Sequence, residues 1–207
     1  MTEFNDKQIE ILQVAERLFA EEGFDGTSIR AIARDAHVNI AMISYYFGSK
    51  EKLLEALITY RTSDMKVKLE NIFKEDVSPF EKIDRLIDLY IFRINQNKCM
   101  YQIMHFELST KKRIIQMESF MEIKRENAEI FRKIVAEGQA KGVFKKDLEI
   151  DLIPATVMGT MIHVRNNKIY FENLFGLTTE EAFEDYINTK VTHHIKQTIK
   201  ALLSYEH

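Results

Sequence analysis

The stretch that decides the fold is GFDGTSIRAIARDAHVNIAMISYYFGSKEKLLEAL, residues 23–57. Within it, Thr27 is a good N-cap for a short helix that ends near Ala36. Asn39 can cap a second short helix, which ends before Gly48. Two short helices joined by a three-residue turn form a helix-turn-helix, whose second helix enters the major groove of DNA. The stretch therefore predicts a DNA-reading module.

The residue types within the module agree with the mechanics of such a reader. Apolar residues at helical spacing are expected to hold the two helices together: Ile29, Ile32, Ala33, Val38, Ile43 and Phe47. The outward face of the second helix is then left with Asn39, Ile40, Ala41, Met42, Ser44 and Tyr45. A face of small and apolar groups suits a groove, where it can contact thymine methyl groups. Ser49 and Lys50, at the next helix N-terminus, offer a hydroxyl, free amides and a cation to a phosphate.

The charge balance weighs both for and against DNA binding. The formal net charge is −3, so the molecule carries no broad basic field. Residues 1–60 hold 6 basic and 10 acidic residues, a balance of −4, whereas residues 27–52 hold 4 basic and 2 acidic residues, a balance of +2. Because DNA affinity depends on local neutralisation of phosphates, the local excess matters more than the total.

The sequence on both sides of the module predicts further helices. Residues 6–22 carry a helical apolar stripe, and Gly23 suits a left-handed position that ends this helix, with Phe24 packing back on its last turn. After the module, Ser49 caps a fourth helix, and residues 78–81 (Ser-Pro-Phe-Glu) form a capping box with proline at the first helical position.

Later helices are expected at 98–108 and about 114–139, from Asp151 onward, and from Thr179 to Leu202. The apolar stripe of the last helix begins at Phe183. The chain holds only 2 prolines and 7 glycines, and no stretch alternates at period two. The expected fold class is therefore all-α.

At these residues the sequence resembles the tetracycline-repressor (TetR) family of bacterial transcription regulators. The resemblance is close over residues 12–57, and its marks are Gly23-Phe24, Thr27-Ser28, Ile32-Ala33, Val38, Tyr46-Phe47 and Ser49-Lys50-Glu51. It implies a three-helix DNA-reading domain at residues 1–48 and a larger helical effector-binding and dimerisation domain at residues 49–207. It also implies a homodimer whose last two helices form a four-helix bundle with those of the second copy.

The resemblance assigns roles to individual residues of the module. Its phosphate-contacting positions fall on Thr27, Ser28, Ser44, Tyr46 and Lys50. Its base-facing positions fall on Ile40, Ala41, Met42 and Tyr45, and Asn39 completes the predicted DNA-binding set. Tyr46 fits a core position equally well.

Two residues depart from the family pattern. His37 stands in the turn where the family usually has glycine, and histidine tolerates a positive φ better than most residues, so we expect the turn to be retained. Ser44 stands where the family usually has tyrosine. Its short hydroxyl reaches less far toward a phosphate.

The middle of the chain is rich in methionine and phenylalanine, which either form plain core or line an apolar cavity in a helical bundle. We assign most of them to core and name six residues as candidates for an effector site: Phe92, Met100, Met104, Met117, Met121 and His163. His163 precedes Arg165 and Asn166, and these polar groups are either pocket contacts or the exposed end of a helix.

Other classes of function lack the residues that they need. The sequence contains no nucleophile motif, paired carboxylates or glycine-rich phosphate loop, and residues 138–142 mark a helix end because no strand precedes them. His193 and His194 are adjacent, so they point to different helix faces and do not have zinc-ligand spacing. We therefore expect no enzyme, no metal site and no cofactor.

The remaining features concern the compartment. The single cysteine, Cys99, excludes an internal disulfide, fits a reducing cytoplasm and is expected to be a small buried hydrophobe. The N-terminal MTEFNDKQIEILQ has acids and no apolar signal region, and no apolar run approaches the roughly 18 residues of a membrane span. We expect a cytoplasmic protein without a membrane partner.

Together these observations predict a homodimeric, ligand-responsive regulator that binds double-stranded operator DNA. The expected mechanism is repression that ends when a small, largely apolar effector shifts the spacing of the two reading helices. The alternative is a helical small-molecule binder or docking protein whose N-terminal module no longer reads DNA. The negative balance of residues 1–60 and the serine at position 44 favour that alternative.

Overall fold

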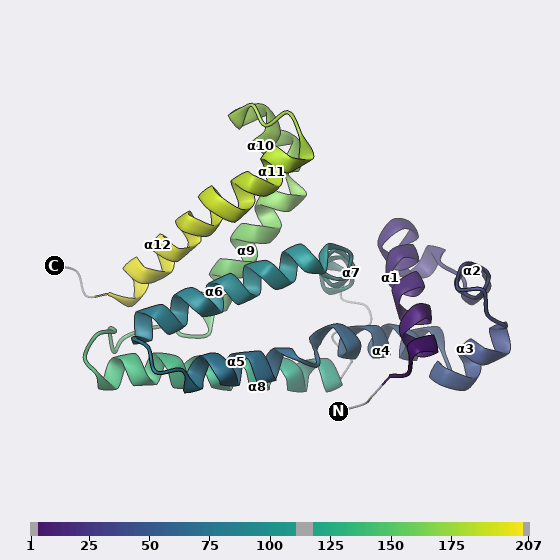
Figure 1. Ribbon diagram of the computed structural model, residues 1–207, viewed down its shortest axis with the longest axis horizontal. Helices are drawn as coiled ribbons and strands as arrows, with labels where there is room; N and C mark the ends of the chain where they lie inside the picture. The colour runs from purple at the N-terminus through teal and green to yellow at the C-terminus, as the bar shows by residue number, and fades with distance from the viewer. Residues whose placement is uncertain (1–3, 111–117, 205–207) are drawn as a thin grey trace. The chain divides into compact units, whose positions relative to one another are not determined.

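The computed structural model describes residues 4–110 and 118–204 (Figure 1). The described residues form helices joined by short connections and contain no strand, which confirms the all-α prediction. The helices are α1 (Asp6–Gly26), α2 (Ile29–Asp35), α3 (Ile40–Phe47), α4 (Lys50–Thr62), α5 (Met65–Lys74), α6 (Pro79–Gln96), α7 (Lys98–Ser109), α8 (Glu118–Ala140), α9 (Leu152–Asn166), α10 (Lys168–Phe175), α11 (Glu180–Tyr186), a π-helix (Ile187–Val191) and α12 (Thr192–Leu203).

Contacts divide the chain into two compact units. The first holds the described residues of Met1–Lys66 and Gln96–Asn127, and the second holds those of Val67–Asn95 and Ala128–His207. The first unit thus groups α4, α7 and the start of α8 with the three N-terminal helices. The functional boundary predicted between residues 48 and 49 stays a prediction.

Local signals fix both ends of α1. Asn5 and Gln8 form a capping box, in which the Asn5 side chain accepts from the Gln8 amide at 2.9 Å and the Gln8 side chain accepts from the Asn5 amide at 3.0 Å. Gly23 kinks the helix with a φ of 73°, a conformation that an L side chain rarely adopts. The Phe24 ring then stacks on Phe19 at 5.2 Å between centroids, as the sequence predicted.

The connection between α1 and α2 differs from the sequence-based prediction. The N-cap of α2 is Ser28, whose hydroxyl accepts from the Ala31 amide at 3.1 Å. The prediction that Thr27 caps this helix is wrong, because its side chain is only 1% exposed and its hydroxyl donates to the carbonyls of Leu18 (3.0 Å) and Gly23 (2.8 Å). Thr27 therefore ends α1 rather than beginning α2.

The core of the first unit is one apolar cluster. All six residues predicted to join the two helices of the module contact it: Ile32, Ala33, Ile43 and Phe47 are buried, and Ile29 and Val38 are partly buried. α7 and α8 extend the cluster with Met100, Ile103 and Phe120. One burial prediction is wrong, because Cys99 is exposed at the start of α7.

The second unit contains most of α5, α6, the later part of α8, and the helices from α9 to α12. Lys82 of α6 is buried and donates to Glu137 of α8 at 2.7 Å and to the Phe73 carbonyl at 2.8 Å. Phe144 is buried against Gly138, where an added Cβ would lie 2.1 Å from the ring. This close approach explains the glycine near the end of α8.

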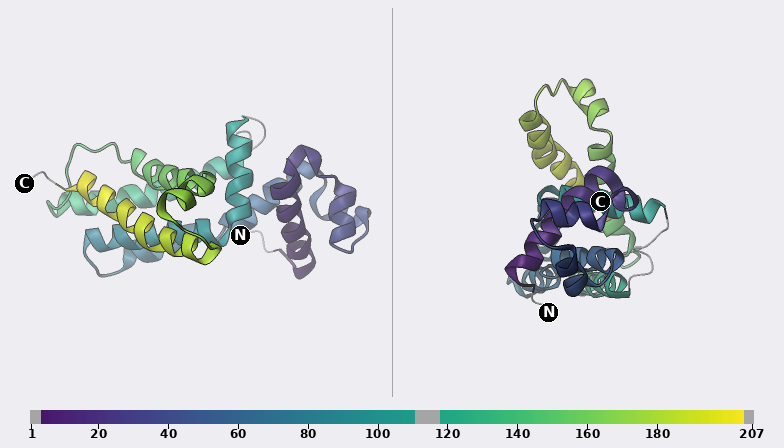
Figure 2. Two further views of the ribbon diagram at one scale, coloured as in Figure 1. Left: turned by 90° about the horizontal axis from the view of Figure 1, so that it is seen from above. Right: turned by 90° about the vertical axis from the view of Figure 1, so that its right-hand side faces the viewer.

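Helices α9 and α12 form the legs of a hairpin in the second unit, and α10 and α11 lie at its tip (Figures 1 and 2). The sequence-based reading did not predict α10 or the π-helix between α11 and α12. It expected Asp151 to cap α9, but no side-chain cap bond is present. The Asp151 carboxylate accepts two hydrogen bonds from Arg132 instead, at 3.1 and 3.0 Å.

Candidate nucleic-acid interface and effector site

The turn between α2 and α3 is closed by backbone hydrogen bonds. The amide of His37 donates to the Arg34 carbonyl at 3.2 Å, and the amide of Val38 donates to the Ala33 carbonyl at 2.9 Å. His37 has a φ of 51° and is the non-glycine residue with positive φ in the described ranges 4–110 and 118–204. The predicted retention of the turn is confirmed, and histidine takes the conformation for which glycine is usual.

Helix α3 presents the face that the sequence predicted. Its N-cap is Asn39, whose side chain accepts from the Ala41 amide at 2.9 Å. One side of α3 is buried through Ile43 and Phe47. The opposite side exposes Asn39, Ile40 (42%), Ala41, Met42 (36%), Ser44 and Tyr45 (84%).

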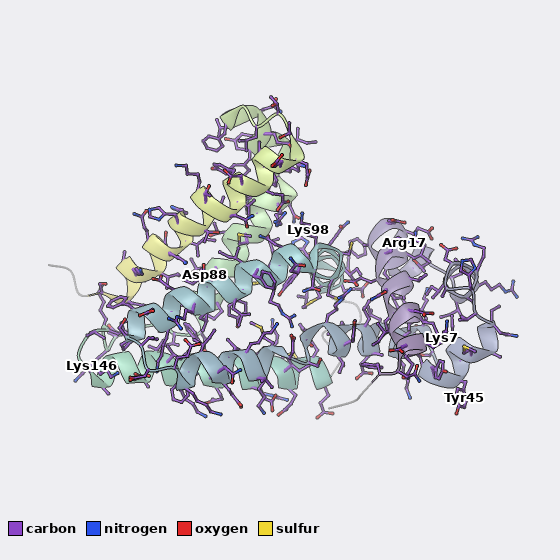
Figure 3. The ribbon with its side chains drawn as sticks, in the orientation of Figure 1. Lys7, Arg17, Tyr45, Asp88, Lys98 and Lys146 are labelled. Carbon is purple, nitrogen blue, oxygen red and sulfur yellow. The ribbon has the colours of Figure 1, made fainter. Side chains whose placement is uncertain are left out.

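Tyr45 and Tyr46 have different surroundings although they are adjacent. Tyr45 projects from α3 away from the helices that hold it (Figure 3). Tyr46 is partly buried against the core, and its ring lies 5.4 Å from that of Tyr45 and 6.2 Å from that of Phe47. Tyr46 thus combines core packing with partial exposure, which accommodates both alternatives that the sequence left open.

Lys50 begins α4 and contacts the preceding segment of the same unit. Its ammonium donates to the carbonyls of Phe24 and Thr27, both at 2.7 Å, and lies 4.4 Å from the centroid of the Phe24 ring. An ammonium has three donors, so these contacts occupy two of them. Ser49 is the N-cap of α4, as predicted, and accepts from the Lys52 amide at 3.2 Å.

The basic side chains of the module are not equivalent. Arg34 donates to Asp35 at 2.8 Å, and Asp35 also accepts from Arg17 at 2.7 Å. Hydrogen bonds from Arg17 first, and from Arg34 second, lower the pKa of the Asp35 carboxyl and keep it ionised. Arg30 and Lys52 are exposed. Arg30 lies in the first turn of α2, two residues after the exposed cap Ser28, and the sequence-based site omitted it although the local excess of positive charge included it.

The predicted effector residues of the first unit do not surround a described cavity. Met100 is 1% exposed and Met104 is partly buried, and both belong to the core around α1. Met121 is exposed on α8. Met117 lies outside the described residues.

The other two predicted effector residues lie in the second unit. Phe92 is exposed on α6, whereas His163 is exposed on α9 and lines a groove of about 450 Å³. Beyond His163, Arg165 is mostly buried and binds Glu184 of α11 and Asn95 of α6. Asn166 is exposed. The polar residues at the end of α9 are therefore neither all pocket contacts nor all exposed, because Arg165 binds α11 to α9.

Residues 4–110 and 118–204 include no group of three or more His, Cys, Asp or Glu side chains that could hold a metal ion. In the same ranges, no helix has the length and hydropathy of a bilayer span.

An exposed α3 on a closed helix-turn-helix defines the class of this protein as a DNA-binding regulator. Residues 11–57 match the family of bacterial regulatory proteins of the tetR type, and residues 79–198 match the tetracyclin repressor-like C-terminal domain. The chain belongs to the TetR family. Members of this family are transcription regulators and not enzymes, as the sequence predicted.

Individual relatives agree with this assignment. The chain is 26% identical over 144 residues to the transcriptional repressor KstR2 of Mycolicibacterium smegmatis, covering 70% of each chain. It is 30% identical over 148 residues to the transcriptional repressor NicS of Pseudomonas putida, covering 67% of this chain and 66% of NicS. The fold is similar to that of the regulator FadR from Bacillus subtilis in complex with stearoyl-CoA, with a TM-score of 0.62, 19% identity and coverage of 90% and 96%.

Proposed function

We propose that this regulator is a homodimeric repressor that reads its operator with α3 and leaves it when a small, largely apolar effector binds. The observation that carries the DNA-reading part is the exposed apolar start of α3. Ile40 and Met42 are large apolar side chains that are exposed to solvent, whereas Ile43 and Phe47 on the other side of α3 are buried. An exposed apolar face of this kind is expected on a helix that enters the major groove, because thymine methyl groups can cover it there.

The phosphate contacts are proposed at both edges of this face. Ser28 is exposed at the N-terminus of α2, and Ser49 is exposed at the N-terminus of α4. Free amides and the positive end of the helix dipole make such termini good anion sites. We add Arg30 to the proposed set, and we assign Thr27 a structural role because its buried hydroxyl serves α1.

The effector proposal rests on apolar side chains outside the module. Phe92 of the second unit, one of the predicted effector residues, is a large apolar side chain exposed on α6. Met121 of the first unit is likewise exposed, on α8. The B. subtilis FadR structure holds stearoyl-CoA, so one protein of this fold accommodates a long acyl chain. These facts favour a probe with a long hydrocarbon chain.

The homodimer is proposed to form through the last two helices, and the exposure of their residues indicates which surface they use. The apolar stripe that begins at Phe183 is largely buried within its own chain, including Ile187 and Ile195. The surface left outside includes Leu152 (62% exposed) and Leu202 (44%). We propose that these outer faces, rather than the inner stripe, meet in the dimer.

Operator release tests the proposed function. The operator is first selected from a random DNA pool, and its affinity for the full chain is then measured by fluorescence anisotropy. Stearoyl-CoA and oleate serve as apolar probes, and coenzyme A serves as the polar control. We expect at least one apolar probe to weaken binding more than tenfold and coenzyme A to have no effect. Equal action of coenzyme A, or no release by either apolar probe, would contradict an effector of this class.

A further inference from the structure

Helix α10 carries an apolar surface that its own chain does not cover. None of its eight residues is buried. Its large apolar side chains are exposed: Ile169 (76%), Tyr170 (60%), Leu174 (55%) and Phe175 (49%). Apolar side chains gathered on one short helix are typical of an interaction surface, whereas scattered ones are ordinary.

The groove beside α10 has a shape and a charge of its own. It measures about 450 Å³ and is lined by Gly159, Thr160, His163, Val164, Phe171, Tyr186, Lys190, Val191 and His194. The side of the groove formed by α9 is open at Gly159, because a Cβ added there would meet no atom within 4 Å. Every ionisable side chain of the lining apart from the Tyr186 phenol is basic. The groove can therefore accept an apolar helix that has carboxylates next to it.

Such a segment exists in this chain, because charge is segregated along its sequence. Residues 169–189 contain five carboxylates and no lysine, arginine or histidine. Residues 190–204 contain three lysines and two histidines and no carboxylate. The first segment includes α10 and α11, and the second includes α12 and the basic wall of the groove.

Contacts within the chain use only part of this charge. Glu184 is bound to Arg165 at 3.0 Å, while Lys196 and Lys200 are bound to α6 carboxylates at 2.6 Å. Glu181 and Asp185 are exposed on α11. Lys190, His193 and His194 are exposed on the π-helix and α12. Each copy therefore presents an acidic edge next to its exposed apolar helix and a basic edge at its groove.

We propose that α10 of one copy docks in this groove of a second copy, with Glu181 and Asp185 facing the basic edge around Lys190 and His194. The proposal rests on the homodimer proposed above and names the element that completes it. Because both surfaces are on every copy, a two-fold axis satisfies both at once and the assembly closes at two chains. The complementary charges favour a second copy of this chain as the occupant.

The first test removes the apolar surface of α10. Ile169→Asn and Leu174→Asn are combined in the full chain, since both side chains are exposed and their loss should not unfold the unit. The matched control combines Val67→Asn and Val143→Asn, which are also exposed apolar residues of the second unit. In sedimentation equilibrium, the dimer dissociation constant of the α10 variant should be at least tenfold higher than that of the wild type. The dissociation constant of the control variant and the circular dichroism of both variants should be unchanged.

The second test exchanges charges. Glu181→Lys with Asp185→Lys, and separately Lys190→Glu with His194→Glu, should each weaken the dimer. An equimolar mixture of the two double variants should restore it as a heterodimer, because both edges again meet opposite charge. A wild-type chain that is monomeric at micromolar concentration would overturn the homodimer itself. A wild-type dimer whose affinity is unchanged in the α10 variant, or not restored in the mixture, would overturn only the role of α10 and its groove.

Discussion

The ammonium of Lys50 lies 4.4 Å from the centroid of the Phe24 ring and donates a hydrogen bond of 2.7 Å to the Phe24 carbonyl. The first residue of α4 therefore holds the segment that leads out of α1. Ser28, the cap of α2, follows this segment directly. One cation thus links the orientation of α4 to the start of α2, where a phosphate contact is proposed.

Lys50→Ala should have two separable effects. Loss of the cation over Phe24 and of its two carbonyl contacts should lower the free energy of unfolding by about 1 kcal/mol. Loss of a charge beside the proposed phosphate sites should weaken DNA binding for all sequences and make the salt dependence shallower by about one counterion. Thermal unfolding and anisotropy titrations at several salt concentrations measure the two effects. Lower stability with an unchanged salt slope would make Lys50 a purely positioning residue.

Arg30→Ala should act on DNA binding alone. Arg30 is exposed in the first turn of α2, so its removal leaves the core intact, and the salt slope should again fall by about one. The matched control is Lys146→Ala, which removes one positive charge from an exposed residue of the second unit (Figure 3). Equal effects of the two substitutions on DNA affinity would show that only net charge matters.

The sequence predicted the module well because its signals are local. Asn39 and Ser49 are caps in the structure, His37 takes the positive φ, and the buried side of α3 follows directly from helical spacing. The misassignment of Thr27 has a physical cause. Thr27 and Ser28 are both good N-caps, and only tertiary contacts with α1 decide which hydroxyl is buried.

The second unit was less predictable because its determinants are distant in sequence. Helix α10 is largely apolar, and none of its residues is buried in the structure. Its sequence therefore showed no apolar stripe of the kind that marks a helix packed on a core. The groove joins residues from five elements, and the sequence of each helix alone does not reveal which of their faces meet. Arg165 shows the same limit, since its carboxylate Glu184 lies 19 residues away on α11.

Glu137→Gln should destabilise the second unit in a pH-dependent way. Hydrogen bonds from Lys141 first, and from buried Lys82 second, lower the pKa of the Glu137 carboxyl. A lowered folded-state pKa means that the stabilisation is complete above the unfolded-state pKa and is lost as the pH falls through the folded-state value. The variant should therefore lose about 1–3 kcal/mol at neutral pH, because Lys82 stays buried without its carboxylate.

Denaturant unfolding between neutral and acid pH measures this effect. The difference between wild type and Glu137→Gln should shrink as the pH falls below the ordinary carboxyl range. Glu129→Gln is the control on the same helix, since its pair with Arg132 is exposed and should change stability by less than about 0.5 kcal/mol. A difference that stays constant into acid would exclude a contribution from the ionised carboxylate.

The operator half-site should contain thymines under the start of α3. The exposed side chains of Ile40, Ala41 and Met42 have no hydrogen-bonding group, so they cannot read guanine as a bidentate arginine would. They can sense the C5-methyl group of thymine by apolar contact. Tyr45 adds an exposed ring for a methyl group and a hydroxyl for a base edge or phosphate. Because readout by each α3 is then modest, the full site should be a palindrome whose half-sites lie an integral number of helical turns apart.

Selection of bound sequences from a random pool, repeated with Ile40→Ala, decides this last point. The substitution removes most of an exposed side chain and leaves the cap at Asn39 in place, so α3 should remain folded. We expect the wild type to enrich thymines at the half-site core and the variant to lose preference at one position, by about 1 kcal/mol for each methyl contact. Val67→Ala, an exposed apolar residue of the second unit, should select the wild-type motif. A core dominated by G·C pairs that is indifferent to Ile40→Ala would place the reading face elsewhere on α3.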